Sequence, residues 1–527
     1  MKFDVMREPC VPVEYLDGSI ELVSIYDSFK DAHKIRSISV ESCFEAFGVR
    51  RFLVTMLMDW LRPENDAFLK NLYNHGHFDM NSFNEYVKIC EESGDVFNIY
   101  SETRPFYQVP APSGKLDLKK ITNLFHTMIN GENHVLHYED VHIDNSDIFL
   151  GLITQSLFLS GKAGEGYSPT INGNSPYYFW IQGSNLFHEL ILNSISIETW
   201  ELATGGAISY VDGTGESVLW RRKSPIPESK SKTKLSNISL LEGLSFLGRR
   251  NTIITDDNLI KGLSIKPSMG YNYKTGIWRD PHCVMIMKED KETKAIYRGA
   301  YNPSSSDTSK IWQSRGLLYN AGSDIKPADS KPLTLFKFGD FTSSSDPMFI
   351  RKLNSFGLST LKMSVYGGYN PGGNKRFNWY TIDTFNVYPE ILQNEYFSKK
   401  YIDLLSMISL AASCIKSNLV KPLNLSNFYL LAFSKLDELV CVCIEKCNDD
   451  SDIILDEYLD SLESEFKGIL LVMAKNYYKD SLQGYDFNKS VKNPKKGSSG
   501  YCNTYRIYNM DLNTLIFDIK SKLKICD

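Results

Sequence analysis

The 527-residue sequence lacks the short signatures of several enzyme and metal-site classes. None of its ten cysteines forms a CxxC pair, which disfavours a zinc ribbon and a thioredoxin-type redox site. The nucleophile-elbow pattern GxSxG is absent, and so are the HExxH of zincins and the GKS or GKT of a Walker loop. The sequence therefore indicates no serine hydrolase, no zincin and no P-loop nucleotide site.

A strong charge bias and long apolar runs are missing as well. The 58 Lys and Arg nearly balance the 63 Asp and Glu, so binding to nucleic acid must use local basic patches rather than a global field. The N-terminus has no apolar leader core, and the most apolar later stretch, residues 404–415, is too short to cross a bilayer. With the cysteines interpreted as reduced core thiols, these features predict a cytoplasmic protein without a membrane partner.

What is present is typical of a globular protein, with 42% hydrophobic and 23% charged residues, and the length allows two to four domains. Residues 1–30 alternate around Asp17-Gly18, which predicts a β-hairpin. Apolar residues at helical spacing predict three helices in the first half of the chain, at 39–61, 145–160 and 184–204. Ser42 is the expected cap of the first helix, and Asn145 or Ser146 that of the second.

The second half of the chain changes character twice. Residues 205–385 contain short β-rich runs separated by Gly, Pro, Asn and Ser. Helical spacing then resumes in four long segments, at about 390–420, 425–448, 452–481 and 503–525. We therefore predict an α+β fold, in which a large mixed N-terminal domain with a hairpin and long loops (1–385) precedes a C-terminal four-helix bundle (386–527).

Two glycine-rich segments and one histidine-rich segment are candidates for function. Gly161–Gly166 and Gly367–Arg376 suit either tight turns or protrusions that approach a nucleic-acid groove closely. Residues 132–142 hold three imidazoles, on His134, His137 and His142, together with two adjacent carboxylates, Glu139 and Asp140. These residues are compatible with a metal site or with a polar surface loop.

The order of several weak motifs resembles that of the CasA family, the large subunit of the type I-E CRISPR surveillance complex Cascade. The segment EPCVPV is similar to the family's opening segment, and residues 97–109 (FNIYSETRPFYQV) are similar to a stretch that ends in Pro-Phe-x-Gln. Residues 151–193 are similar to its helix, glycine loop and following helix, and GLSFLGRRNTI, GIWRDPHCVMI and SVYGGYN follow in the family's order. With the expected bundle, the resemblance spans essentially the whole chain.

This resemblance implies a non-catalytic DNA reader that needs no cofactor and no metal. In this family the guide RNA carries sequence specificity, while the large subunit checks the protospacer-adjacent motif on double-stranded DNA and helps to open the duplex. The implied partners are the CRISPR guide RNA, the target DNA, the backbone, small and guide-processing subunits of Cascade, and a recruited helicase-nuclease.

The resemblance also implies DNA contacts at the matching positions of this sequence. The motif-reading glycine loop corresponds to Gly161, Lys162, Gly164, Glu165 and Gly166. The lysine finger corresponds to Lys266 or Lys274, which the sequence does not separate. The wedge that opens the duplex corresponds to Asn370, Pro371, Gly372, Gly373, Asn374, Lys375 and Arg376.

Two further contacts follow from the same resemblance. A loop that contacts the guide-RNA handle corresponds to Asn133, His134 and His137, which accounts for the histidine-rich segment better than a metal does. A basic loop in the bundle is expected to contact phosphates through Lys489, Lys492, Lys495 and Lys496.

The sequence departs from the family pattern at two sites. The wedge lacks the usual glutamine and offers Pro371 and Asn374 instead, and no cysteine lies between Cys90 and Cys283, where some members hold zinc. Two other functions remain open from the residues. One is a structural assembly subunit whose glycine segments are only turns, and the other is a metal-dependent nuclease built on the histidines of residues 132–142.

Overall fold

The N-terminal hairpin forms as predicted. Strands β1 (Val11–Tyr15) and β2 (Ile20–Val23) pair antiparallel on either side of Asp17-Gly18, where Gly18 takes a φ of +88°. Helix α1 (Ile25–Lys30) leads to β3 (Ile35–Ile38), which pairs with the other edge of β1. The result is a three-stranded sheet of order β2-β1-β3.

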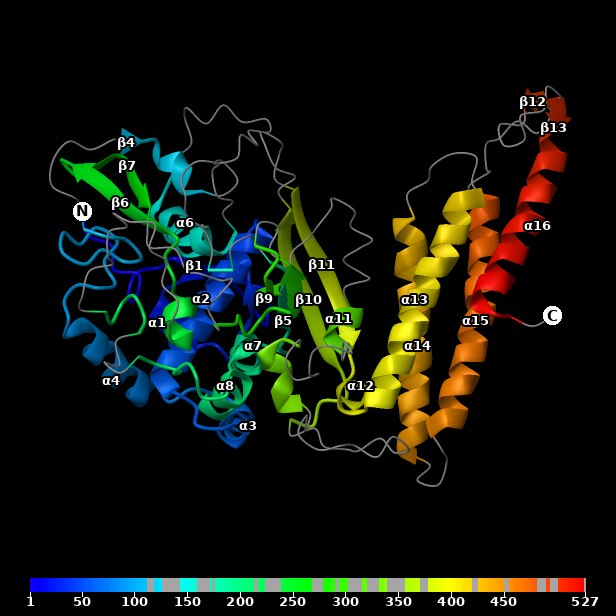
Figure 1. Ribbon diagram of the computed structural model, residues 1–527. Helices are drawn as coiled ribbons and strands as arrows, with labels where there is room; N and C mark the ends of the chain where they lie inside the picture. Colours follow the sequence, from blue (N-terminus) through cyan, green and yellow to red (C-terminus); the bar gives the residue numbers. More distant parts are fainter. Residues whose placement is uncertain are drawn as a thin grey trace. The chain divides into compact units, whose positions relative to one another are not determined.

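The chain divides into two units by its internal contacts (Figure 1). The first comprises Met1–Ser306, Ser323–Gly339 and Asn354–Val387, and the second comprises Asp307–Gly322, Asp340–Leu353 and Tyr388–Asp527. The structure is a computed structural model that describes residues 1–110, 118–125, 143–158, 171–172, 176–212, 217–222, 238–267, 278–289, 293–301, 315–319, 331–338, 356–369, 378–418, 425–449, 455–480, 490–492 and 501–525.

The core of the first unit surrounds one long helix, α2 (Cys43–Leu61). Its N-cap is the predicted Ser42, whose Oγ accepts a hydrogen bond from the backbone N–H of Glu45. Every residue from Arg51 to Asp59 is buried, so the helix is covered on all sides rather than along one stripe. The other elements of this unit are α3 (Asp66–His75), α4 (Met80–Glu91), β4 (Leu118–Lys119), the 3-10 helix η1 (Ile121–Leu124), α6 (Asn145–Phe158), β5 (Tyr178–Ile181), α7 (Leu186–Asn193), α8 (Ile197–Thr204), α9 (Leu240–Leu244), β6 (Arg249–Asp256), β7 (Leu259–Pro267), β8 (Met285–Glu289), β9 (Ile296–Ala300), η3 (Leu333–Phe338), β10 (Leu361–Tyr369) and β11 (Asn378–Val387).

The β-rich middle of the chain forms small antiparallel sheets. β11, β10 and β5 make one sheet in that order, β4, β7 and β6 make a second, and β8 pairs with β9. Helix α2 packs against β10 on one side and crosses α6 on another. The crossing is close, because a Cβ at Gly48 would lie 2.6 Å from Oγ1 of Thr154. These contacts make α2, α6, β5 and β10 one packed scaffold.

The single helix predicted over 184–204 is wrong, because the chain forms two helices, α7 and α8, separated at Ser194–Ser196. Ser196 caps α8 by accepting a hydrogen bond from the backbone N–H of Thr199. The carbonyl groups of Ile191, Leu192 and Ser194 at the end of α7 accept hydrogen bonds from the buried ammonium of Lys337. Serine side chains favour helix caps over helix interiors, so a new helix begins after Ser196. Lys337, distant in sequence, stabilises the end of α7 through its hydrogen bonds.

The cap of α6 also differs from the prediction, since Asp144 takes this role in place of Asn145 or Ser146. Oδ1 of Asp144 accepts from the backbone N–H of Asp147 at 2.9 Å, and Oδ2 of Asp147 accepts from the backbone N–H of Asp144 at 3.1 Å. This reciprocal arrangement has the geometry of a capping box, which satisfies two backbone donors rather than one.

The second unit is a helical bundle. Its long helices α13 (Glu395–Asn418), α14 (Ser426–Asp449), α15 (Leu455–Asp480) and α16 (Thr504–Leu523) pack side by side (Figure 1). Four shorter elements complete its described part, namely α11 (Gly316–Tyr319), α12 (Pro389–Gln393), β12 (Ser490–Lys492) and β13 (Tyr501–Asn503). Inside the bundle, buried Arg315 donates to Oδ1 of Asp437 at 2.7 Å. The predicted α+β class with a helical C-terminal region is confirmed.

Two general features of the described residues complete the fold. Their helices include none with the length and apolar character needed to span a bilayer. The eight cysteines whose side chains are described are free thiols, and five of them are buried.

Candidate nucleic-acid interface

Most residues predicted to contact nucleic acid lie outside the described residues. They are Gly161, Lys162, Gly164, Glu165, Gly166, Lys274, Asn370, Pro371, Gly372, Gly373, Asn374, Lys375, Arg376, Asn133, His134, His137, Lys489, Lys495 and Lys496. For Lys266 and Lys492 the backbone alone is described, in β7 and β12. The structure does describe residues that flank these two loops in the sequence, up to Phe158 and from Ile171 for the glycine loop, and up to Tyr369 and from Asn378 for the wedge loop.

Core side chains hold the chain on both sides of the glycine loop. Just before the end of α6, the carbonyl oxygen of Leu157 accepts a hydrogen bond from the phenol of Tyr178 at 3.2 Å. On the far side, Nδ2 of Asn172 donates to Oδ2 of Asp280 at 3.1 Å. Residues 159–170 therefore start and end at positions that are tied to the core.

Asp280 belongs to a fully buried charge cluster. Arg51 of α2 donates from Nη1 and Nη2 to the two carboxylate oxygens of Asp280, at 2.8 and 2.6 Å. Nη1 of Arg51 also lies 2.8 Å from Nδ1 of His282. Because a guanidinium can only donate, Nδ1 of His282 is the acceptor, and its Nε2–H donates to the carbonyl oxygen of Asn193 at 3.0 Å. His282 is therefore a neutral imidazole.

The protonation states of this cluster follow from burial and pairing. Burial opposes ionisation of Asp280, but the Arg51 guanidinium holds the pKa of its carboxyl well below the usual range. Burial lowers the pKa of His282 although Asp280 is close. Burial also raises the pKa of Tyr178, so its phenol keeps the proton that it donates to Leu157. At neutral pH the cluster holds one cation and one anion.

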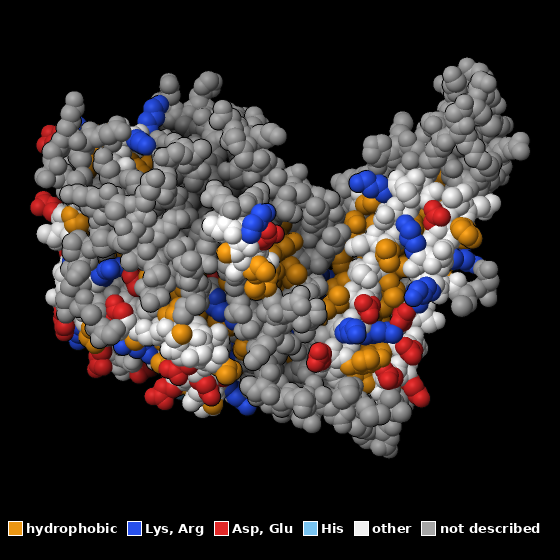
Figure 2. Space-filling model, in the orientation of Figure 1, with side chains coloured by type: hydrophobic (Ala, Val, Ile, Leu, Met, Phe, Trp, Pro, Cys, Tyr) orange, Lys and Arg blue, Asp and Glu red, His pale blue; other side chains and the backbone are white. Residues whose placement is uncertain are grey.

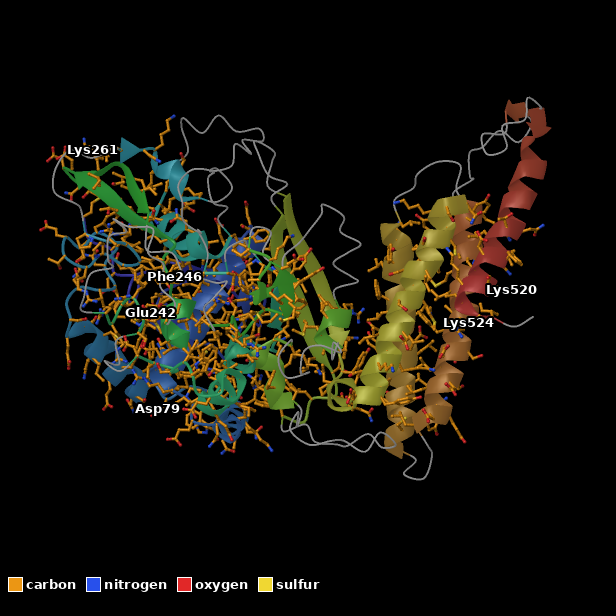
Figure 3. The ribbon with its side chains drawn as sticks, viewed as in Figure 1. Asp79, Glu242, Phe246, Lys261, Lys520 and Lys524 are labelled. Carbon is orange, nitrogen blue, oxygen red and sulfur yellow. The ribbon has the colours of Figure 1, made fainter. Side chains whose placement is uncertain are left out.

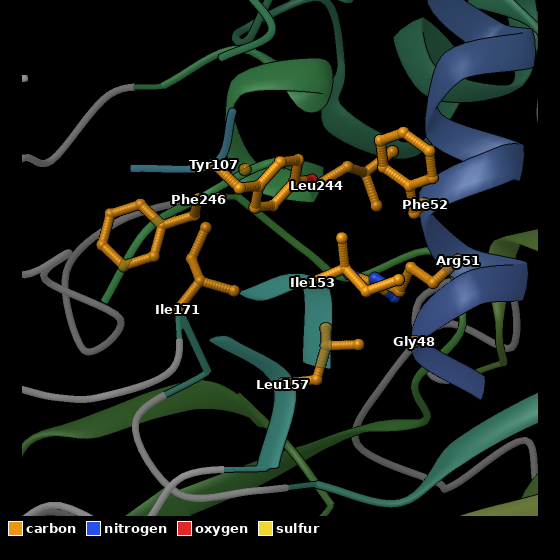
Figure 4. Close-up of a pocket in the computed structure, with 10 residues that line it drawn as sticks. Gly48, Arg51, Phe52, Tyr107, Ile153, Leu157, Ile171, Leu244 and Phe246 are labelled. Carbon is orange, nitrogen blue, oxygen red and sulfur yellow. The ribbon is translucent and has the colours of Figure 1, made fainter. Parts of the chain in front are cut away.

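A small cavity lies where the ends of the glycine-loop segment meet α2. Leu157 and Ile171, one from each end, line it together with Arg51 and Phe52. Figure 4 shows the Arg51 side chain reaching from α2 towards Ile153 of α6. The cavity is too small for a nucleotide, so we interpret it as part of the core beneath the loop and not as a ligand pocket.

Strands β10 and β11 pair as a hairpin and bracket residues 370–377, which include the predicted wedge at 370–376. β10 also pairs with β5, where Tyr366 lies opposite Tyr178. A Cβ at Gly367 would lie 2.4 Å from the ring of Tyr177, so only glycine lets this ring pack against the strand. Tyr178 thus contacts both the end of α6 and the strand that leads to the wedge loop. The two loops leave from neighbouring parts of one scaffold.

Lys266, one of the two finger candidates, lies near the end of β7 and pairs through its backbone with Arg250 of β6. Figure 3 labels Lys261, which lies on the same strand nearer the hairpin turn. This hairpin is attached to α6, because Nδ2 of Asn251 donates to Oε1 of Gln155. The strand of Lys266 is therefore tied to the same helix that leads into the glycine loop.

Sequence reasoning did not assign roles to Arg51, Asp280 or Tyr178. The ion pair joins residues 229 positions apart, which no local pattern reveals. One usable signal exists, because the charges of Arg-Asp-Pro-His at 279–282 sit between Trp278 and the apolar strand that follows. Charges placed within an apolar run indicate buried, paired groups.

The glutamine of the Pro-Phe-x-Gln stretch has a structural role that the sequence also did not reveal. Nε2 of Gln108 donates to the carbonyl oxygen of Ile99 at 2.8 Å, and its Oε1 accepts from the backbone N–H of Ile253 at 2.8 Å. This buried amide joins the loop of residues 97–109 to β6.

Metal ligation finds no support in the part of the chain that the structure describes, where no group of three or more His, Cys, Asp and Glu side chains could hold an ion. The histidines of the nuclease alternative, His134, His137 and His142, lie outside that part. His188 of α7 is partly buried, with its ring centroid 4.2 Å from that of Tyr73.

The fold defines a class of protein, namely a large α+β protein that also contains a helical bundle. The segments that hold its candidate recognition loops are attached to one buried scaffold in the first unit. A family model for the CRISPR-associated protein Cse1 matches residues 4–358, which is more than half of the 527 residues. The chain belongs to the Cse1 family. No curated protein matches its sequence.

Solved structures share the fold over almost the full chain. Thermobifida fusca Cse1 is similar with a TM-score of 0.70 and 14% identity, covering 100% of this chain and 99% of that one. Thermus thermophilus CasA, also called Cse1, gives 0.62 and 15%, covering 98% and 100%. A chain of a CRISPR RNA-guided surveillance complex gives 0.60 and 14%, covering 98% and 99%. The resemblance to the CasA family is confirmed.

Proposed function

We propose that this chain is the large subunit of a type I-E Cascade surveillance complex, and that it recognises the protospacer-adjacent motif on double-stranded DNA and helps to open the duplex. Membership in the Cse1 family carries this proposal. The fold shared with a chain of an RNA-guided surveillance complex supports it. In such systems base pairing reads the target, so the protein needs to check only a short motif and the shape of the duplex.

The glycine loop and the wedge loop suit this role. Gly164 and Gly166 allow the backbone to approach a DNA groove closely, with Lys162 beside them. In the wedge, Pro371 and Asn374 combine rigidity with an amide that can enter a base step. The shared scaffold beneath both loops favours a fixed spacing between them, which a reader that both recognises and opens DNA requires.

Lysine contacts complete the proposed interface. The finger is Lys266 or Lys274, of which Lys266 lies in a hairpin attached to α6. Alanine at the true finger should weaken DNA binding and reduce its salt dependence, since a phosphate contact is lost.

We further propose a division of labour along the chain. Residues 1–385 read DNA and contact the guide-RNA handle through Asn133, His134 and His137. Residues 386–527 form the bundle, which docks on other Cascade subunits and contacts phosphates through Lys489, Lys492, Lys495 and Lys496. Figure 2 shows hydrophobic side chains on the surface of the bundle, which suits such docking. The exposed hydrophobic side chains of the bundle include Leu410, Leu430, Leu431, Val442, Val472 and Phe517.

The proposed subunit is not an enzyme, and degradation of the target falls to a recruited helicase-nuclease. Incubation of the purified chain with duplex DNA and Mg²⁺ or Mn²⁺ should leave the DNA intact. Metal-dependent cleavage that disappears in His137→Ala would contradict this and support the nuclease alternative.

The role of the glycine loop is tested by substitution in the assembled complex. Gly164→Leu and Gly166→Leu should abolish binding to motif-bearing duplex DNA while the complex still assembles, because a side chain blocks the close approach. Gly468→Leu is the matched control, since Gly468 lies exposed in α15 with no atom within 4 Å of the position that a Cβ would take. Unchanged DNA binding by both loop variants would refute the assigned role.

A further inference from the structure

We propose that Asp280 and Tyr178 form a clamp that fixes both ends of the glycine-loop segment, and that these two residues are positioning residues for duplex recognition. The inference rests on the proposed function of that loop for its effect on DNA. The clamp itself rests on contacts among described residues, so the two can fail separately.

Asp280 holds the chain after the glycine loop. Its Oδ1 accepts from the backbone N–H of His282 at 3.0 Å, and both of its oxygens accept from Arg51. The carboxylate therefore has one fixed orientation inside the core. Its hydrogen bond with Nδ2 of Asn172 at 3.1 Å is charge-assisted, which makes it stronger than a bond between neutral groups. Asn172 is thereby held directly after the loop.

Tyr178 holds the chain before the glycine loop. Its ring lies 4.9 Å from that of Phe47 and 5.2 Å from the guanidinium carbon of Arg51, and its backbone pairs with Tyr366. The phenol donates to the carbonyl oxygen of Leu157 in the last described turn of α6. This turn is therefore attached to a side chain that the sheet holds in place.

Arg51 connects the two residues of the clamp, because its guanidinium binds Asp280 and lies against the ring of Tyr178. A loop whose ends are fixed before binding loses less conformational entropy when it meets DNA. The clamp thus raises affinity for the duplex without contacting it.

The clamp is tested first without DNA, by hydrogen exchange of the full chain. Tyr178→Phe removes the phenol's bond to the Leu157 carbonyl and its hydrogen bond with the Asn172 side chain. It should speed exchange of the amides from Leu157 to Asn172 by about five-fold or more, since about five-fold is the factor expected for one lost hydrogen bond. Tyr210→Phe is the matched control, because Tyr210 is buried and donates to the carbonyl oxygen of Ile195 at 3.0 Å, away from the loop. Equal exchange in the two variants would overturn the clamp.

Asn172 distinguishes a specific bond from general packing. Asn172→Ala removes the donor, and Asn172→Asp puts a second carboxylate beside Asp280 in a side chain of the same size. The clamp requires faster exchange in both variants, with the larger effect for Asn172→Asp. If Asn172→Asp exchanges like the wild type, no such bond holds the loop and the clamp is refuted.

Binding by the assembled complex then tests the functional consequence. Tyr178→Phe and Asn172→Ala should each weaken binding to motif-bearing duplex DNA about five-fold or more and leave binding to a single-stranded complementary target unchanged. Faster exchange between Leu157 and Asn172 together with unaltered duplex binding would support the clamp. The same result would contradict the motif-reading role of the loop. Unaltered exchange would overturn the clamp whatever the DNA result.

Discussion

At the scale of single residues, Asp280 illustrates how a buried charge depends on its partner. Asp280→Asn keeps the shape of the side chain but leaves the Arg51 guanidinium buried without an anion. We expect a loss of about 3–5 kcal/mol in the free energy of unfolding, measured by denaturant titration of the first unit's transition. Glu438→Gln removes an exposed pair with Lys435 and should cost less than about 1 kcal/mol. Similar effects in both variants would contradict this account.

Glu45 makes stability depend on pH near neutrality. Burial, with the carboxylates of Asp147 and Glu41, raises the pKa of this residue from 4.5 to about 7. Between these values the folded state keeps a proton that the unfolded state has released, so stability falls as pH rises through this window. Glu45→Gln should therefore stabilise the protein by about 1–2 kcal/mol at pH 8 and change little at pH 4.5. Thermal unfolding at both pH values checks this, and a pH-independent difference would refute it.

At the scale of elements, two glycines are predicted to respond oppositely to the same change. Gly367→Ala places a methyl group 2.4 Å from the Tyr177 ring and should destabilise the first unit by about 1–3 kcal/mol. Gly468→Ala lies in open space within α15 and should stabilise the bundle by about 0.5–1 kcal/mol. Calorimetry of each variant measures the change in stability, which should be a loss for Gly367→Ala and a gain for Gly468→Ala. A neutral Gly367→Ala would mean that the Tyr177 ring can move away at little cost.

The elements also indicate which parts of the fold a sequence can predict. The Asp17-Gly18 hairpin, α2 and the long helices of the bundle follow from local turn chemistry and helical spacing, and the structure contains them. The break between α7 and α8 was not predicted, because Lys337, whose ammonium caps α7, lies 145 positions from Leu192. Local periodicity continues through such a break, and only the tertiary contact reveals it.

At the scale of the whole molecule, the bundle surface is expected to mediate assembly. Phe517 of α16 is 71% exposed and is one of several apolar side chains exposed on the bundle, which suits a surface that a partner covers. Phe517→Glu should weaken incorporation of the chain into the complex by roughly ten-fold while the free chain still folds. Asn513→Glu, on the same helix, is the matched control. Co-purification of the complex measures the effect, and normal incorporation of Phe517→Glu would argue against docking through this residue.

The candidate interface was predictable only in part. The order of motifs identified the family, and that assignment is confirmed by the match over residues 4–358. The supports of the loop were not predictable, because Arg51 and Asp280 meet only in the folded chain, 229 positions apart. The choice between Lys266 and Lys274 stays a prediction, as do the roles of Gly164 and Asn374.

The central claim is that this chain makes duplex binding depend on a short motif beside the target. The most direct test is DNA binding by the assembled complex across a library randomised next to the target, with and without this chain, at one stated salt concentration. We predict a sharp preference for a short motif that disappears when the chain is left out. Binding that depends on guide pairing alone, and is the same without the chain, would contradict the account.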